Sequence, residues 1–193
     1  MGDTRQTILR VAMVLFSKKG FDSISMRNIA DKVNISPPAL YNHFKDKRTL
    51  YLCVIEESFS NKSILLVDAL TIEDTAIKRM EAFVFTLSQI LVGDPEFKRL
   101  MQREQLDGDK QRLEYLAKEV FGSVFIVLTS LITEIKPTCD AHGIAVTIMG
   151  MVQKHIEIEP LAQFFPDYNK ENHTPAYVTQ LTMSMLLAFF GTK

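Results

Sequence analysis

The sequence predicts an all-α protein of about nine helices, with a three-helix head at the N-terminus followed by a larger helical bundle. Two observations carry this prediction. Apolar residues recur at helical spacing, and 47% of the 193 residues are hydrophobic, which is enough to bury a core. The 8 glycines and 7 prolines are too few for the frequent turns of a β or α/β protein, and no strand pattern or internal repeat is evident.

The head begins with an amphipathic helix, expected over residues 4–19. Its apolar stripe consists of Ile8, Ala12, Leu15 and Phe16. Gly20 ends this helix, because glycine adopts the left-handed conformation that commonly follows a helix end. Ser25 is then a suitable N-cap for a second, short helix over residues 26–32.

A third helix is expected from Ser36 to about Asp46. Ser36 caps it, and Pro37 and Pro38 occupy its first turn, where the missing N–H groups cost little. Two short helices joined by a brief turn and braced by a longer first helix form a helix-turn-helix. In that arrangement the last helix presents its N-terminal residues to base edges in the major groove.

Charge is divided unevenly along the chain, whose overall formal charge is -1. Through Leu50 there are nine basic and four acidic residues, a net charge of +5, so the remainder carries −6. A basic N-terminal block on an acidic body indicates that the head binds a polyanion.

Longer helices are expected beyond the head, starting with one that leads out from Lys47. The apolar spacing predicts further helices over residues 73–92, 95–106, 109–135, 139–165 and 175–190. Residues 166–174 form the most polar loop between them.

Enzymatic chemistry and metal binding are not expected. The sequence has no Ser/His/Asp order, no glycine-rich phosphate loop, no HExxH motif and no paired carboxylates with a plausible cleft. Cys53 and Cys139 lie far apart, and His142 is the one further ligand near Cys139. We therefore expect no metal, no cofactor and no enzyme activity.

A membrane location is not expected either. Residues 1–10 lack the long apolar run of a signal peptide, and no stretch approaches the length of a membrane span. The sequence thus predicts a soluble, cytoplasmic protein with no membrane partner.

The head resembles the DNA-binding region of the tetracycline-repressor (TetR) family over roughly residues 5–52, about a quarter of the chain. The family pattern has a Gly-Phe/Tyr pair, a Ser/Thr cap, an Ile-Ala pair, a Leu-Tyr-x-His/Tyr-Phe helix and a lysine in the next helix. The matching residues are Gly20-Phe21, Ser25, Ile29-Ala30, Leu40-Tyr41-Asn42-His43-Phe44 and Lys47.

The resemblance implies a double-stranded DNA operator as partner. It makes Tyr41 and His43 contacts to phosphates or thymine methyls, and Lys47 a phosphate contact. The Pro-Pro-Ala first turn of the third helix offers no side-chain donor, so base reading rests on thymine methyls, on Asn42 and on Arg27, with a share for DNA shape. The predicted DNA-binding residues are Arg27, Ser36, Pro37, Pro38, Ala39, Tyr41, Asn42, His43 and Lys47.

A homodimer is expected, because one head covers only a half-site. The last helix is apolar almost all round, and a helix without a polar face must be covered on every side. Members of the resembled family commonly pair their last two helices in a four-helix bundle. The candidate interface residues are Met151, His155, Tyr177, Leu181, Met185 and Ala188.

The body is also expected to bind a small-molecule effector. Met and Phe residues in its central helices suit a cavity for an apolar guest, although the same residues form an ordinary core. The candidate pocket residues are Phe83, Leu87, Met101, Gln105, Phe121, Phe125, His142 and Met149, and further polar groups that could orient a ligand are Arg103, Glu104 and Gln153. By the resemblance, a bound molecule shifts the fourth helix and changes the separation of the heads.

The sequence therefore predicts a DNA-binding domain over residues 1–48 and a ligand-binding and dimerisation domain over residues 49–193. The predicted function is a sequence-specific transcriptional regulator, a repressor released by a small apolar or amphipathic ligand. The alternative is a DNA-binding adaptor whose body docks another protein.

Overall fold

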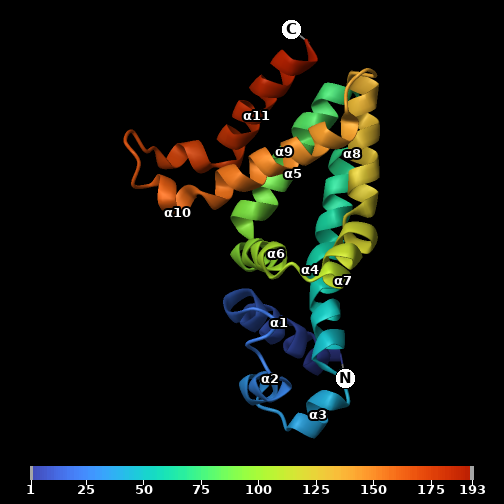
Figure 1. The fold of residues 1–193 in the computed structure, drawn as a ribbon, viewed down its shortest axis with the longest axis vertical. Helices are drawn as coiled ribbons and strands as arrows, with labels where there is room; N and C mark the ends of the chain where they lie inside the picture. The colour runs from blue at the N-terminus through green and yellow to red at the C-terminus, as the bar shows by residue number, and fades with distance from the viewer. Residues whose placement is uncertain (1, 192–193) are drawn as a thin grey trace. The chain divides into compact units, whose positions relative to one another are not determined.

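The computed structural model describes residues 2–191, with side chains from residue 4 onward, and this range contains eleven α-helices and no strand (Figure 1). The predicted all-α fold is confirmed. The elements are α1 (Gly2–Lys19), α2 (Met26–Val33), α3 (Pro37–Tyr41), α4 (Lys47–Ala69), α5 (Ala76–Gly93), α6 (Pro95–Asp107), α7 (Lys110–Tyr115), the π-helical segment η1 (Leu116–Val120), α8 (Gly122–Ile135), α9 (Ala141–Glu157), α10 (Glu159–Ala162), the 3-10 turn η2 (Lys170–His173) and α11 (Pro175–Phe190).

Two expected helices are divided in the structure. The helix expected over residues 109–135 is interrupted by η1, which the spacing does not reveal because the buried Leu116, Val120 and Val124 still follow one another every four residues. The helix expected over residues 139–165 ends at Glu157. Pro160 explains this end, since proline has no N–H and its ring crowds the carbonyl four residues earlier.

The third helix is shorter than expected and ends at Tyr41 rather than near Asp46. The N–H groups of His43 and Phe44 both bond to the carbonyl oxygen of Leu40, which closes the helix in a tight turn. Asp46 then begins α4, because its carboxylate accepts the backbone N–H of Thr49 at 2.7 Å. This hydrogen bond lowers the pKa of the Asp46 carboxyl.

The first compact unit comprises residues up to 61 together with residues 95–120. Within it α1 packs on α2 and α6, and α2 packs on α3. Its core holds the predicted stripe of α1, apart from the half-buried Leu15. The core residues include Ile8, Ala12, Phe16, Ile24, Ile29, Leu40, Phe44, Leu50 and Ile55.

The second compact unit comprises residues 62–94 and 121–193. Here α5 packs on α8, α9 and α11, and α9 also packs on α8 and α11. Its fully buried side chains include Met80, Val84, Leu128, Ile132, Ala145, Ile148 and Val152.

The two units do not follow the expected boundary at residues 48/49, because residues 95–120 pack with the head. Chain segments distant in sequence therefore complete the first unit. The functional division into DNA-binding and ligand-binding domains stays a prediction.

Among the described residues no single helix is both long and apolar enough to cross a membrane. One bent pair of consecutive helices, Lys110–Val120 and Gly122–Ile135, reaches that length and composition jointly.

Candidate nucleic-acid interface

The start and end of α2 are set by local hydrogen bonds. Ser25 and Asn28 form a capping box, in which the Asn28 N–H donates to Ser25 Oγ at 3.1 Å and the Ser25 N–H donates to Asn28 Oδ1 at 2.9 Å. Asn34 ends the helix in the left-handed conformation, with φ 61°. Asparagine tolerates this conformation, so the chain turns sharply into α3.

The N-terminus of α3 is fixed by Ser36, whose Oγ accepts the backbone N–H of Ala39 at 3.3 Å. Leu40 is fully buried beneath the helix, so α3 lies with a defined face against the core. Pro37 and Pro38 are exposed on its first turn. The structure thus gives Ser36 a capping role in addition to the predicted DNA contact.

The remaining predicted DNA-binding side chains are mostly accessible. Tyr41 is 51% exposed, and Arg27 and Asn42 are also exposed. Ala39 and His43 are half-buried. The five-residue helix α3 and the turn after it therefore present most of these residues, and Arg27 lies on α2. Leu40 and Phe44 are buried beneath them.

Lys47 differs from this group, because its ammonium is directed into the head. Lys47 Nζ donates to the carbonyl oxygen of Phe21 at 3.0 Å and lies 4.2 Å from the centre of the Phe21 ring. The side chain is half-buried. Lys47 at the start of α4 is thereby bonded to the turn between α1 and α2.

A buried polar cluster contacts the Phe21 ring. It consists of Tyr51, Glu104 and Arg112, and we call it the Arg112 cluster. Arg112 Nε donates to Glu104 Oε2 at 3.0 Å, and the Tyr51 hydroxyl donates to Glu104 Oε1. Glu104 is 1% exposed and Arg112 7%. The Arg112 guanidinium carbon lies 4.8 Å from the centre of the Phe21 ring, and the Tyr51 ring lies 4.9 Å from it.

The protonation states of the cluster follow from burial and from Glu104. Burial raises the pKa of the Tyr51 phenol far above its ordinary value, and the hydrogen bond to Glu104 adds to the rise. For Arg112 burial opposes the charged form, but the hydrogen bond and the charge of Glu104 outweigh it, so the pKa of the guanidinium is raised. The Tyr51 phenol is therefore neutral and the Arg112 guanidinium is charged throughout the physiological pH range.

A second arginine, Arg103, bonds to backbone carbonyls at the C-terminal end of α1. Arg103 Nε donates to the carbonyl oxygen of Ser17 at 2.8 Å, and its Nη2 donates to that of Lys18. These are carbonyls that the helix leaves without partners at its C-terminus. Gly20 follows with φ +80°, and a Cβ there would lie 3.3 Å from Arg103 Nη1.

Arg103 and Glu104, two of the polar groups considered for orienting a ligand, are engaged by α1 and by the Arg112 cluster. The sequence does contain a signal for the cluster. Glu104 continues the buried stripe of Phe97 and Leu100 along α6, and a carboxylate on an apolar stripe requires a buried partner.

Comparisons with known proteins agree with this geometry. Residues 8–54, which span the helix-turn-helix, match the family described as bacterial regulatory proteins, tetR family. An HTH-type transcriptional regulator of Staphylococcus aureus (strain USA300) is 27% identical over 164 residues, which cover 81% of this chain and 87% of that protein. The chain belongs to the TetR family. It is a DNA-binding transcriptional regulator rather than an enzyme.

Solved structures share the fold of this TetR-family chain. The fatty acid degradation regulator FadR of Bacillus halodurans has a TM-score of 0.72 at 16% identity, covering 96% of this chain and 97% of its own. The ketosteroid transcriptional regulator KstR2 of Mycobacterium tuberculosis has a TM-score of 0.70 at 16% identity, covering 98% and 95%.

The predicted dimer residues lie on α9 and α11. Leu181, Met185 and Ala188 follow one side of α11 at helical spacing, and Met185 is 50% exposed. Met151, His155 and Tyr177 are half-buried, as is Leu181. His155 Nε2 lies 2.8 Å from the carbonyl oxygen of Asn172 and its ring 5.0 Å from that of His173, so this histidine also ties α9 to η2.

The opposite side of α11 is buried within the second unit. Its buried residues are Val178, Thr179, Thr182, Met183 and Leu186. The helix is therefore apolar on two sides, one of which packs on its own unit while the other stays accessible. The accessible stripe of α11 consists of Leu181, Met185 and Ala188.

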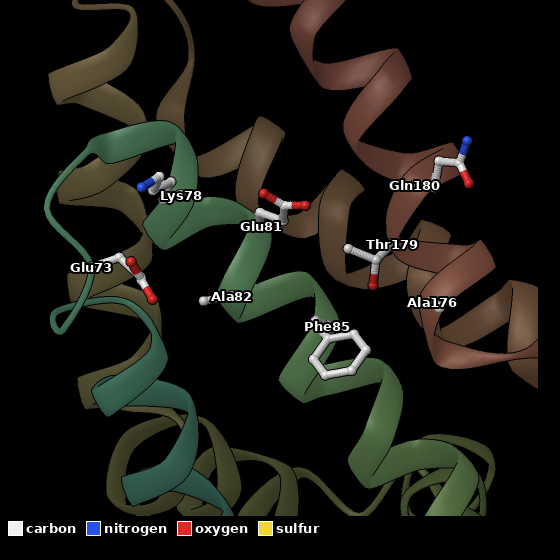
Figure 2. A pocket seen from close by; sticks show the side chains of 8 residues that line it. All are labelled: Glu73, Lys78, Glu81, Ala82, Phe85, Ala176, Thr179 and Gln180. Atoms are coloured by element: carbon white, nitrogen blue, oxygen red, sulfur yellow. The ribbon is translucent and has the colours of Figure 1, made fainter.

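A groove of about 620 Å³ lies between α5 and α11 (Figure 2). It is lined by Glu73, Lys78, Glu81, Ala82, Phe85, Ala176, Thr179 and Gln180, a partly charged set. None of the predicted pocket residues lines it. The nearest of them in sequence, Phe83, is 1% exposed in the core, whereas Phe85 is 38% exposed, because residues two apart on a helix face different sides.

The other pocket candidates are spread over the two units. Met101 and Gln105 belong to the first unit, and the second unit holds the rest. In the second unit the His142 ring packs edge-on against Phe125, with ring centres 5.1 Å apart. Leu87, Phe121 and Met149 are half-buried, while Gln153 donates to Glu157 at 2.6 Å. Among the described residues no group of three or more His, Cys, Asp or Glu could hold a metal ion.

Proposed function

We propose that this TetR-family chain is a cytoplasmic repressor that binds its operator as a homodimer and is released by a small apolar or amphipathic molecule. The observation that carries the DNA-binding part is the presentation of α3. Its underside is fixed by the buried Leu40, while Tyr41, Asn42 and the two prolines of the first turn are accessible.

Base reading in this proposal combines three kinds of contact. The Pro37-Pro38-Ala39 turn packs on thymine methyls, because it has no side-chain donor. Asn42 bonds an adenine edge, and Arg27 adds a contact from α2. Tyr41, His43, Ser36 and Lys47 bind the DNA backbone and so set the register of the head.

Two substitutions separate base reading from phosphate binding. Lys47→Ala should weaken binding to every sequence and lower the slope of log K against log salt by about 0.9. Asn42→Ala should act at one base position, with a loss of roughly 1–3 kcal/mol. Fluorescence anisotropy with DNA from upstream of the gene and with a random duplex measures both. Lys110→Ala and Asn61→Ala, two exposed positions outside the head helices, serve as matched controls.

If both head variants bind like their controls, α3 is not the reading helix. A loss for Asn42→Ala that is equal on operator and random DNA would instead move this residue from the bases to the backbone.

The homodimer is supported by the accessible stripe of α11, which a second copy would cover together with Met151, His155 and Tyr177. A two-fold pair of heads must fit half-sites about 34–36 Å apart. A symmetric operator with that spacing is therefore expected.

The effector proposal is supported by the half-buried Leu87, Phe121, Phe125 and Met149 and by the names of two structural relatives, a fatty acid degradation regulator and a ketosteroid regulator. Phe83 and His142 complete the proposed set within the second unit. Met101 and Gln105 belong to the first unit, and a ligand contact by them stays a prediction. Titrating a long-chain fatty acid and a steroid into the operator complex tests the class of ligand, and release of the DNA is the expected result.

An adaptor is the second candidate. Leu161, Phe164 and Phe165 are exposed in and after α10, Phe164 by 78%, and such side chains suit a protein partner. If neither the fatty acid nor the steroid releases the operator DNA, this alternative is favoured.

A further inference from the structure

The ammonium of Lys47 is held in place before any DNA is bound. It gives one hydrogen bond to the Phe21 carbonyl and lies against the Phe21 ring. An ammonium has three N–H donors, so two remain for other acceptors. Because the side chain is only half-buried, these donors can still reach a ligand at the surface. The position of the ammonium therefore depends on where Phe21 lies.

Phe21 is positioned in turn by the Arg112 cluster. The Arg112 guanidinium and the Tyr51 ring both lie within 5 Å of the centre of the Phe21 ring, at 4.8 and 4.9 Å. Arg112 is bonded to Glu104 at 3.0 Å and to Asp107 at 3.3 Å, so its plane cannot turn freely. A chain of direct contacts thus runs from α6 and α7 through Phe21 to the ammonium of Lys47.

We propose that Arg112 is a positioning residue for DNA binding: by holding the Phe21 ring, it keeps the Lys47 ammonium where a DNA phosphate binds. The inference rests on the proposed function, in which Lys47 contacts a phosphate. Arg112 is 7% exposed and paired with three carboxylates, those of Glu104, Asp107 and Asp109, so it has no surface to offer a phosphate itself. Its contact with Phe21 connects it to the ammonium of Lys47.

The residue types suit this role. A lysine side chain loses much rotamer freedom when it binds a phosphate, and a side chain already held in place loses less. Arginine suits the position behind the ring, because a guanidinium stacks on an aromatic face while its edges bond carboxylates. The ammonium of a lysine at position 112 is a point charge without a planar face, so it would not reproduce this contact.

The test is a set of double-mutant cycles between Lys47 and the residues behind it. Arg112→Lys keeps the charge that Glu104 requires but loses the stacked plane. Phe21→Leu keeps the backbone carbonyl but loses the ring, and Phe21→Tyr restores a ring. Arg99→Lys, at an exposed position of α6, is the matched control for Arg112→Lys. Each substitution is made with Lys47 and with Lys47→Ala.

The measurement is the salt dependence of binding to a labelled random-sequence duplex and to upstream DNA of equal length. We expect Lys47→Ala to lower the salt slope by about 0.9. Arg112→Lys and Phe21→Leu should each weaken binding about three- to tenfold, in line with couplings between neighbouring residues, when Lys47 is present, and should have little effect in the Lys47→Ala background. Phe21→Tyr should recover most of the binding that Phe21→Leu loses, because it keeps a ring, and Arg99→Lys should bind like the original chain.

Three results would overturn the inference. Equal losses with and without Lys47 would mean that Arg112 and Phe21 act by another route. Unchanged binding for both Arg112→Lys and Phe21→Leu would mean that Lys47 needs no positioning, and the proposed phosphate contact would survive. An unchanged salt slope for Lys47→Ala would overturn that contact too, and leave Lys47 as a bond between α4 and the α1–α2 turn.

Folding is monitored for every variant by circular dichroism at the binding temperature. If Arg112→Lys does not fold, the cycle with Phe21→Leu decides the question, since that substitution leaves the Arg112–Glu104 ion pair intact.

Discussion

The two compact units bury different kinds of polar group. The first unit encloses a charged pair, Arg112 and Glu104, bonded across a gap of eight residues and joined by Tyr51 from another helix. Among the described residues the buried polar side chains of the second unit are all Ser or Thr. Two of these, Ser88 and Thr179, donate to carbonyls one turn earlier in their own helices, each at 2.7 Å.

The two kinds of buried polar group differ in how strictly they fix the arrangement of the helices around them. A buried ion pair tolerates one arrangement, because its charges lose their compensation if the partners move apart. A hydroxyl bonded within its own helix makes no demand on the neighbouring helix, so the fully buried contacts between helices of the second unit are apolar. Its polar links between helices, such as Arg79–Glu134, lie nearer the surface. The first unit is therefore suited to holding a reading head in one position. The second unit is suited to presenting further apolar surface to a partner or ligand.

Removing one polar group from each kind of site should give the largest contrast in stability. Glu104→Leu leaves Arg112 buried without its main partner, and we expect a loss of about 3–5 kcal/mol of unfolding free energy. Thr179→Val keeps the side-chain volume but removes a hydroxyl that donates to the Pro175 carbonyl of its own helix, and the loss should be only about 1 kcal/mol. Urea denaturation compares the two. Similar losses for both variants would remove the distinction between the units.

The accessible stripe of α11 provides the next contrast. Met185→Arg should place an unpaired charge in the proposed dimer interface and weaken operator binding by roughly a hundredfold or more, because a buried unpaired charge costs several kcal/mol. Ile72→Arg changes a residue that is 73% exposed in the turn after α4 and should have little effect. Sedimentation and anisotropy report assembly and binding. A Met185→Arg chain that remains dimeric would place the interface elsewhere.

The smallest expected effect is on the pH dependence of stability. The pKa of Tyr51 is raised in the folded state, so above about pH 10 the unfolded chain loses this proton while the folded chain retains it. The contribution of Tyr51 is fully present below pH 10 and declines at higher pH, by about 1.4 kcal/mol per unit. Tyr51→Phe should show a correspondingly flatter decline in denaturation experiments between pH 10 and 11. Parallel curves for the two chains would contradict a buried, neutral phenol.

Much of the helix-turn-helix follows from local chemistry. Ser25, Ser36 and Gly20 act at the expected helix ends, and α11 has the expected bounds, Pro175–Phe190. These features depend on hydrogen bonds between residues three or four apart, so the sequence determines them without knowledge of the rest of the chain.

Apolar spacing along whole helices predicted less about helix breaks and about which side of a helix lines a groove. The spacing of apolar residues runs through η1 without a change, so it could not reveal that break. Nor could it show that Phe85 faces the groove while Phe83 is buried. Composition alone does not show which side of α5 meets another helix. That choice depends on how α8, α9 and α11 pack around it.

Sequence reasoning alone predicted the all-α class, the end of α1, the starts of α2 and α3 and the accessible first turn of α3, since each arises from neighbouring residues or from apolar periodicity. Only the tertiary structure joined Lys47 to Phe21, Tyr51 to Glu104 and Arg103 to Ser17, pairs that lie 26, 53 and 86 residues apart. Periodicity identifies the face that a helix buries but not the side chain that it meets there. These contacts therefore required the packed arrangement of α1, α4, α6 and α7.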